Sequence, residues 1–254
     1  MKKRSTAAGA SAPTPRGAVL LSALAGAALL AAAPARAAPM LFEAVLAPLN
    51  DSGVSGLARL SLDGNLLTVN ITASGLTPDQ PHPQHIHGRF DDAGRPTNST
   101  VPTLAQDTDR DGFVEVREGV PTYGPVILNF DSSPGSGRFP TAPGGVLDFT
   151  ETYDVTNDAL FFDPLGGQKF KGSDIFPLTD REIVLHGLML DASTGLGGGP
   201  PPGEADGTAG YKILLPVAAG EIVAVATNVP EPASLALLGA GVLGLALARR
   251  RKPA

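Results

Sequence analysis

The chain has 254 residues, of which 25 are acidic and 19 are basic, and it contains no cysteine. The lack of cysteine excludes disulfides, thiolate metal sites and cysteine nucleophiles, so stability must come from a packed core and from bound ions. The two ends hold nine of the 19 basic residues but only one of the 25 acidic residues, which leaves the middle with a charge balance of −14. A field of that sign repels phosphate backbones and attracts cations, so we expect no nucleic-acid partner.

The first 37 residues have the three parts of a secretory signal peptide in the required order. A basic start precedes an apolar run over 17–33, and Ala35-Arg36-Ala37 supplies the small-residue cleavage pattern. We expect signal peptidase to cut after Ala37, which leaves residues 38–227 as one exported domain. A domain of about 190 residues is long enough to bury a sizeable core.

The middle of the chain has the pattern of short β-strands separated by glycine and proline. In the clearest stretch, Ala58, Leu60 and Leu62 alternate with polar residues, and the alternation resumes after the turn signal Asp63-Gly64. This pattern predicts a hairpin with one buried and one exposed face. Further strands are predicted at 41–46, 84–89, 126–130, 146–152, 182–190, 211–217 and 221–226. We therefore predict an all-β domain folded as a Greek-key sandwich or barrel.

Three of the four histidines lie in the stretch "HPQHIHG", residues 82–88. If this stretch is a strand, His85 and His87 project from the same face, because side chains alternate along a strand. Two imidazoles on one face can reach a single metal ion, and His82 is placed to add a third nitrogen or to cap the site. His186 lies among strongly apolar residues, where a histidine is either held by a backbone partner or belongs to a site.

Neutral imidazoles suit Cu²⁺ or Zn²⁺, so we predict that His85 and His87 can hold a transition metal, with His82 as a further candidate. A hydrogen-bonded structural network of the same histidines is the alternative interpretation. The "HIHG" that follows an early hairpin resembles the CHRD domain, an extracellular β-domain named after chordin. It also resembles the His-x-His strand of copper-zinc superoxide dismutase, and "IVLHG" around His186 resembles the late copper-binding strand of that enzyme. This second resemblance implies that His85, His87 and His186 form one transition-metal site as copper ligands. The enzyme's bridging histidine, zinc ligands, disulfide and catalytic arginine have no identified counterpart.

The stretch "DTDRDGFVEVRE", residues 107–118, fits the full twelve-position pattern of an EF-hand calcium loop. Gly112 allows the sharp turn, and a flexible cage of oxygen ligands suits Ca²⁺ better than Mg²⁺. The candidate ligands are Asp107, Asp109, Asp111, the carbonyl of Phe113, Glu115 and the bidentate Glu118. Pro102 before the loop and Pro121 after it predict no flanking helices, so the ion is expected to pin a surface loop rather than drive a switch. An acidic, solvated turn is the alternative interpretation.

Residues 228–254 end the chain with Val229-Pro230-Glu231-Pro232, a short apolar stretch and a basic cluster. The apolar stretch is barely long enough to cross a hydrocarbon core, and the basic cluster favours a cytoplasmic end. The three parts together resemble the PEP-CTERM sorting signal. The resemblance implies a Gram-negative source, a short C-terminal transmembrane helix that anchors the chain transiently in the inner membrane, and cutting by an exosortase-type protease near Pro230, Glu231 and Pro232. A plain membrane anchor is the alternative.

The main hypothesis is a non-enzymatic, exported CHRD-like protein of the cell surface or the exopolysaccharide matrix, with a structural or adhesive role. It is expected to be stabilised by Ca²⁺, to carry Cu²⁺ or Zn²⁺ at its histidines, and to contact surface polysaccharide or surface proteins. The alternative is an extracytoplasmic copper enzyme of superoxide-dismutase type. Either metal hypothesis requires the three imidazoles to converge with ring nitrogens about 3 to 4 Å apart, and a separation beyond about 8 Å would remove the site.

Overall fold

The computed structural model describes residues 37–191, 204–226, 238–239 and 241–242. By their contacts the residues form two units, one of 37–231 and one made of both chain ends. The predicted signal peptide, apart from Ala37, and the Pro230-Glu231-Pro232 motif lie outside the described residues. Of the predicted C-terminal helix only residues 238–239 and 241–242 are described, and they are helical. No helix within the described ranges is long and apolar enough to cross a membrane.

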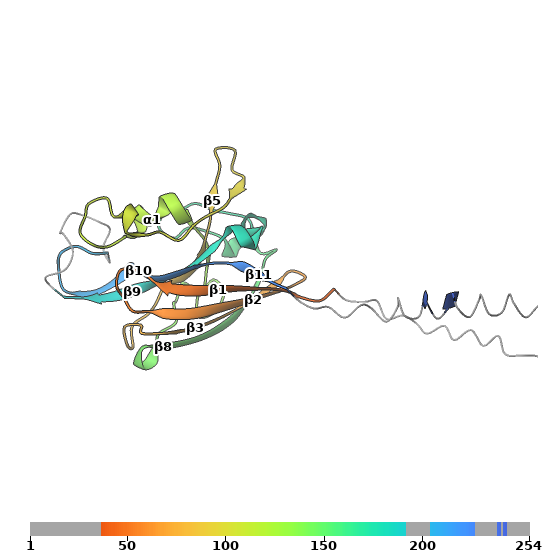
Figure 1. Cartoon of the computed structure of the whole chain (residues 1–254), viewed down its shortest axis with the longest axis horizontal. Helices are drawn as coiled ribbons and strands as arrows, with labels where there is room; N and C mark the ends of the chain where they lie inside the picture. The colour runs from red at the N-terminus through yellow and green to blue at the C-terminus, as the bar shows by residue number, and fades with distance from the viewer. Residues whose placement is uncertain (1–36, 192–203, 227–237, 240, 243–254) are drawn as a thin grey trace, which may run out of the picture. The chain divides into compact units, whose positions relative to one another are not determined.

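Within this first unit, the described residues 37–191 and 204–226 form a curled antiparallel sheet with one α-helix (Figure 1). The strands of the large sheet are β1 (Met40–Pro48), β2 (Ser55–Asp63), β3 (Leu66–Ser74), β4 (Gln84–His87), β7 (Val126–Asn129), β8 (Val146–Asp154), β9 (Glu182–Leu190), β10 (Gly210–Glu221) and β11 (Val223–Val225). A separate small hairpin consists of β5 (Arg89–Phe90) and β6 (Pro96–Thr97). The helices are α1 (Val116–Tyr123) and the 3-10 turns η1 (Leu104–Gln106), η2 (Pro143–Gly145), η3 (Asp158–Leu160), η4 (Gly172–Ile175) and η5 (Leu178–Asp180).

The neighbour order in the large sheet is β7-β4-β9-β10-β1-β2-β3-β8, and β11 also pairs with β1. One strand, β1, joins the two halves, because its residues Leu41–Glu43 pair with β11 while Ala47 and Pro48 pair with β10. The late strand β10 thus lies beside β1, which is the first strand of the β1-β2-β3 meander. This is the neighbour order of a Greek key. The prediction of an all-β domain is confirmed, and the strands form a curled antiparallel sheet that resembles half a barrel.

The two halves of the curled sheet enclose the main hydrophobic core. On β2 and β3 the predicted apolar positions are buried and the residues between them are more exposed, as the alternation required. β4 and β7 differ, because every residue of both strands is buried. The outer face of this half is covered by a second cluster in which Tyr123 of α1 packs with Leu49, Val184 and Ala219.

The prediction that no helix flanks the acidic loop is wrong on the C-terminal side, where α1 begins at Val116, within the last three positions of the loop. Glu115 is the residue before the helix and forms a capping box with Glu118, which satisfies amides of the first turn. Gly119 is needed for packing rather than for a break, because a Cβ at this position would overlap the ring of Tyr123. Capping and the burial of Tyr123 therefore outweigh the cost of Pro121 inside the helix. On the N-terminal side the loop is preceded only by the single turn η1.

Candidate metal sites

β4 and β9 bring three histidines together on the outer face of the sheet. The register pairs His85 with Val184 and His87 with Glu182, so these residues and His186 share one face. One ring nitrogen each of His85, His87 and His186 lies within 4.8 Å of the other two, and all three side chains are buried. The limit of 4.8 Å is wider than the spacing of about 3 to 4 Å expected around one bound ion and well below the separation of about 8 Å that would exclude a site.

Backbone carbonyls orient two of the three imidazoles. Nδ1 of His87 lies 2.9 Å from the carbonyl oxygen of Gly124, and Nδ1 of His186 lies 2.6 Å from that of Leu214. A carbonyl oxygen can only accept, so each Nδ1 carries the proton and each Nε2 keeps its lone pair. Within the described structure these two Nε2 atoms and both ring nitrogens of His85 have no hydrogen-bond partner. Metal-bound histidines are held in this way, with the second ring nitrogen donating to a fixed acceptor.

The environment of the three histidines keeps them neutral. Burial, with repulsion from His186 and His87, lowers the pKa of His85 well below its usual value. Burial lowers the pKa of His87 to about 4, although the hydrogen bond to Gly124 acts in the opposite direction. Burial and repulsion from His87 lower the pKa of His186 to about 3. At neutral pH the imidazoles are therefore in the form that a metal ion requires.

A cavity of about 190 Å³ lies against the three imidazoles. Its other walls are almost entirely apolar and come from Pro83, Val116, Val126, Phe139, Pro164, Leu165, Ile213 and Leu214. Among the described residues no fourth histidine or carboxylate joins the group. Three candidate ligands beside a cavity would leave a coordination position for a small molecule, an arrangement found in catalytic zinc sites, whereas structural sites usually have four protein ligands.

His82 lies apart from this group, although it was a candidate ligand. Its Nδ1 is 2.8 Å from the carbonyl oxygen of His186, and its Nε2 is 2.9 Å from that of Thr77. Each ring nitrogen therefore faces a backbone carbonyl, and the single N–H of the neutral imidazole donates to one of the two at a time. The contacts tie the entry of β4 to β9 and give His82 a structural role.

Two buried carboxylates close to the histidines were not identified from the sequence. Glu182 is fully buried, and in the described structure neither of its carboxylate oxygens has a hydrogen-bond partner. Burial, with the negative charge of Glu221, raises the pKa of Glu182 to about 8. Burial also raises the pKa of Glu204 to about 7, and Glu204 shares a second cavity, of about 290 Å³, with His87. The alternation of β9 was the available signal, because it places Glu182 on the same face as His186.

In the acidic loop the carboxylates converge around Asp109. Oxygens of Asp107, Asp109 and Glu118 lie within 4.8 Å of one another, and so do oxygens of Asp109, Asp111 and Glu115. The structure thus brings together all five carboxylates of the predicted calcium site. Phe113, whose carbonyl was the sixth candidate, directs its side chain toward a small cluster of Leu190, Ala205 and Leu215.

Backbone amides give the loop its shape. Asp107 accepts hydrogen bonds from the amides of Arg110, Asp111 and Gly112, at 2.6, 3.2 and 3.0 Å. Gly112 has a φ of +93°, which fits the sharp turn expected at this position. Glu118 accepts hydrogen bonds from the amide and the hydroxyl of Thr108, both at 2.6 Å. Hydrogen bonds from amides of the loop, and from the Thr108 hydroxyl, therefore hold the carboxylates of Asp107 and Glu118 against the loop itself.

The carboxylates of the loop repel one another. Burial, followed by the interactions with Glu118 and Asp111, raises the pKa of Glu115 to about 9. Burial and the charge of Asp111 also raise the pKa of Asp109. Burial acts in the same direction on Glu118, but hydrogen bonds from Glu115 and Thr108 lower its pKa to about 2. A cation among these groups would relieve the repulsion and favour their charged forms.

The PEP-CTERM protein-sorting motif matches residues 228–252. This motif marks an exported protein that is anchored transiently in the membrane and processed by an exosortase-type protease. No curated protein matches the chain.

Proposed function

We propose that the chain is a metal-binding protein of the cell surface or exopolysaccharide matrix of a Gram-negative bacterium. The signal-peptide pattern and the sorting motif support export and release at the surface. Within the exported β-domain, residues 107–118 bind Ca²⁺ and the histidines bind Cu²⁺ or Zn²⁺. The role is structural or adhesive, with surface polysaccharide or another surface protein as the partner, in keeping with the CHRD resemblance.

The arrangement of His85, His87 and His186 is the observation that carries this proposal. Unpaired nitrogens of buried polar side chains are costly, and three such groups facing one another need a common partner. A divalent ion supplies that partner, because it accepts a lone pair from each imidazole. The apolar walls of the cavity strengthen the interaction by keeping bulk water away.

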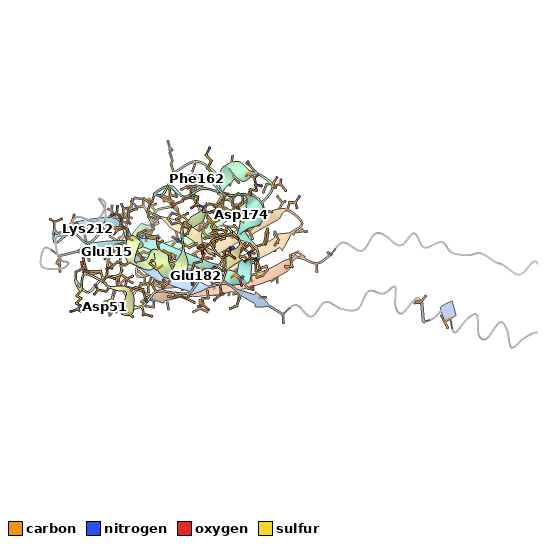
Figure 2. All side chains as sticks on the ribbon, turned by 90° about the horizontal axis from the view of Figure 1, so that it is seen from above. Asp51, Glu115, Phe162, Asp174, Glu182 and Lys212 are labelled. Carbon is orange, nitrogen blue, oxygen red and sulfur yellow. The ribbon has the colours of Figure 1, made fainter. Side chains whose placement is uncertain are left out.

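Calcium has a structural role in this proposal, because the side chain of Asn50 ties the acidic loop to a segment far from it in the sequence. The side chain of Asn50 donates to the carbonyls of Val114 and Pro216 at 3.0 and 2.9 Å and accepts from the amide of Val114 at 2.7 Å. Figure 2 shows Asp51 and Glu115 at the same end of the domain, where this junction lies. An ion held by the loop therefore stabilises contacts between segments far apart in the sequence.

A copper enzyme of superoxide-dismutase type is the second candidate, and the cavity beside the imidazoles favours it. The buried Arg181 does not supply the missing catalytic arginine, because its guanidinium donates to the carbonyls of Thr97, Asp174 and Asp180. The copper-loaded protein would have to turn over superoxide, with activity lost in His85→Ala. Absence of turnover in a protein with stoichiometric copper would reject this candidate and leave the metal site intact.

Elemental analysis of the processed protein, purified after removal of its signal peptide, tests the proposal. We expect Ca²⁺ together with one equivalent of copper or zinc, and in His85→Ala/His87→Ala we expect Ca²⁺ alone. Equal copper and zinc contents in the two proteins would show that the histidines form a structural network. Deletion of 228–254 is expected to abolish surface display without changing either metal.

A further inference from the structure

We propose that helix α1 couples the two ion sites, so that Ca²⁺ in the loop 107–118 increases the affinity of the histidine centre for its transition metal. This inference rests on both ion sites of the proposed function and concerns how one regulates the other. By linkage, the transition metal must increase the affinity for Ca²⁺ by the same factor.

The helix begins inside the calcium loop. Its first residue, Val116, is the tenth of the twelve loop positions. The candidate ligand Glu115 is the residue before the helix, and the candidate ligand Glu118 lies in its first turn. Glu115 is only 4 % exposed, its Oε1 has no hydrogen-bond partner in the described structure, and its carboxylate lies with those of Asp109 and Asp111. A buried carboxylate aimed at the other acids indicates a cation there independently of the number of acids in the loop.

The same helix forms part of the histidine centre. Val116 lines the cavity over the imidazoles. At the other end of the helix, the ring centroid of Tyr123 lies 4.5 Å from that of His87. The next residue, Gly124, provides the carbonyl that accepts the Nδ1 proton of His87. One helix thus holds both a wall of the cavity and the acceptor that fixes one ligand.

A hydrogen bond of 3.0 Å from the Tyr123 hydroxyl to the carbonyl of Val116 links the two ends of α1. A helix of eight residues is too short to be stable alone, and Gly119 and Pro121 weaken it further. The position of α1 is therefore set by the contacts at its two ends. Ca²⁺ bound by Glu115 and Glu118 fixes the first turn, and the tyrosine contact transmits that order to Gly124.

The expected size of the effect follows from the role of the Gly124 carbonyl. Loss of the outer partner of a metal-bound histidine typically lowers metal affinity about 10- to 100-fold. Removal of Ca²⁺ makes the Gly124 carbonyl less well ordered but does not remove it. We therefore expect the loss of transition-metal affinity to lie at the lower end of that range. An effect of about tenfold also lies within the common range of allosteric coupling.

The test is a Zn²⁺ titration of the processed protein with and without saturating Ca²⁺, at matched ionic strength, with Ca²⁺ binding measured separately by calorimetry. We expect Zn²⁺ to bind about tenfold more weakly without Ca²⁺. In Tyr123→Phe, which keeps the ring and removes the hydroxyl, we expect both ions to bind and the tenfold difference to shrink. Asp148→Asn, an exposed acid-to-amide change on β8, is the matched control and should retain the full difference.

The outcomes separate this inference from the proposed function. Equal Zn²⁺ affinity with and without Ca²⁺, in a protein shown to bind both ions, would overturn the coupling and leave the two sites in place. Failure of the wild-type protein to bind Zn²⁺ or Ca²⁺ would overturn the proposed function and the coupling together. An undiminished difference in Tyr123→Phe would show that the tyrosine contact is not the link.

Discussion

Glu182→Gln is expected to make the domain more stable at neutral and alkaline pH. The carboxyl of Glu182 has a pKa of about 8 in the folded protein, compared with 4.5 when it is exposed in the unfolded chain. The folded state therefore holds the proton over a range in which the unfolded state has released it. The stability that this group contributes is complete below pH 4.5 and is lost as the pH rises toward 8.

The size of the effect follows from the two pKa values. At about 1.36 kcal/mol per pKa unit, the stability lost between low pH and pH 7 is roughly 3 kcal/mol, with a little more lost by pH 8. Glutamine has nearly the same shape and does not titrate, so the variant is expected to keep this stability. The buried histidines act in the opposite direction, because their pKa values are lowered, but their contribution cancels between wild type and variant.

Urea unfolding at a series of pH values, with Ca²⁺ present and without transition metal, measures this difference. A transition-metal ion is left out because a cation close to Glu182 would itself lower the pKa. The difference in unfolding free energy between variant and wild type should rise with pH by roughly 3 kcal/mol. Glu151→Gln, at a partly exposed position on β8, is the matched control. Parallel pH curves for Glu182→Gln and wild type would refute the reasoning.

Two further predictions concern the ions. Ca²⁺ at 100 times its Kd should raise the unfolding free energy by about 2.7 kcal/mol, which raises the Tm of a domain of this size by roughly 5 to 10 °C. Scanning calorimetry measures this shift in Tm, and Asp107→Asn should abolish it. An equal Tm with and without Ca²⁺ in the wild-type protein would contradict the calcium site. His82→Ala should lower stability by about 1 to 3 kcal/mol through the loss of its two carbonyl contacts and leave the bound zinc unchanged. His186→Ala should instead remove the zinc, and equal zinc content in these two variants would reject the assignment of ligands.

The β-strands and their buried faces could be predicted because they follow from the order of apolar and polar residues within short stretches of the sequence. Alternating apolar residues at Ala58, Leu60 and Leu62 defined one face of a hairpin, and the turn signal at Asp63-Gly64 placed the reversal. The same period put His85 and His87 on one face without any knowledge of the partner strand. The spacing of the five loop carboxylates likewise predicted which groups would converge.

The rest depends on contacts that the sequence does not reveal. Gly119 and Pro121 discourage a helix locally, yet α1 forms because Tyr123 is buried against the outer face of the sheet. The distinction between His82 and the other histidines also depends on tertiary contacts, since the carbonyl of His186 is brought to His82 by the pairing of β4 with β9. In the sequence Glu182 is one acid among 25, and nothing local shows that it is fully buried in the fold.

The most direct test of the central claim is the electron paramagnetic resonance spectrum of the processed protein loaded with one equivalent of Cu²⁺. The account predicts stoichiometric binding and hyperfine splitting from three imidazole nitrogens, with His87→Ala losing one of them. The neutral imidazoles of the buried site should hold the ion even at moderately acidic pH. A spectrum with oxygen ligands only, or copper that is removed by simple dialysis, would contradict a metal centre at His85, His87 and His186.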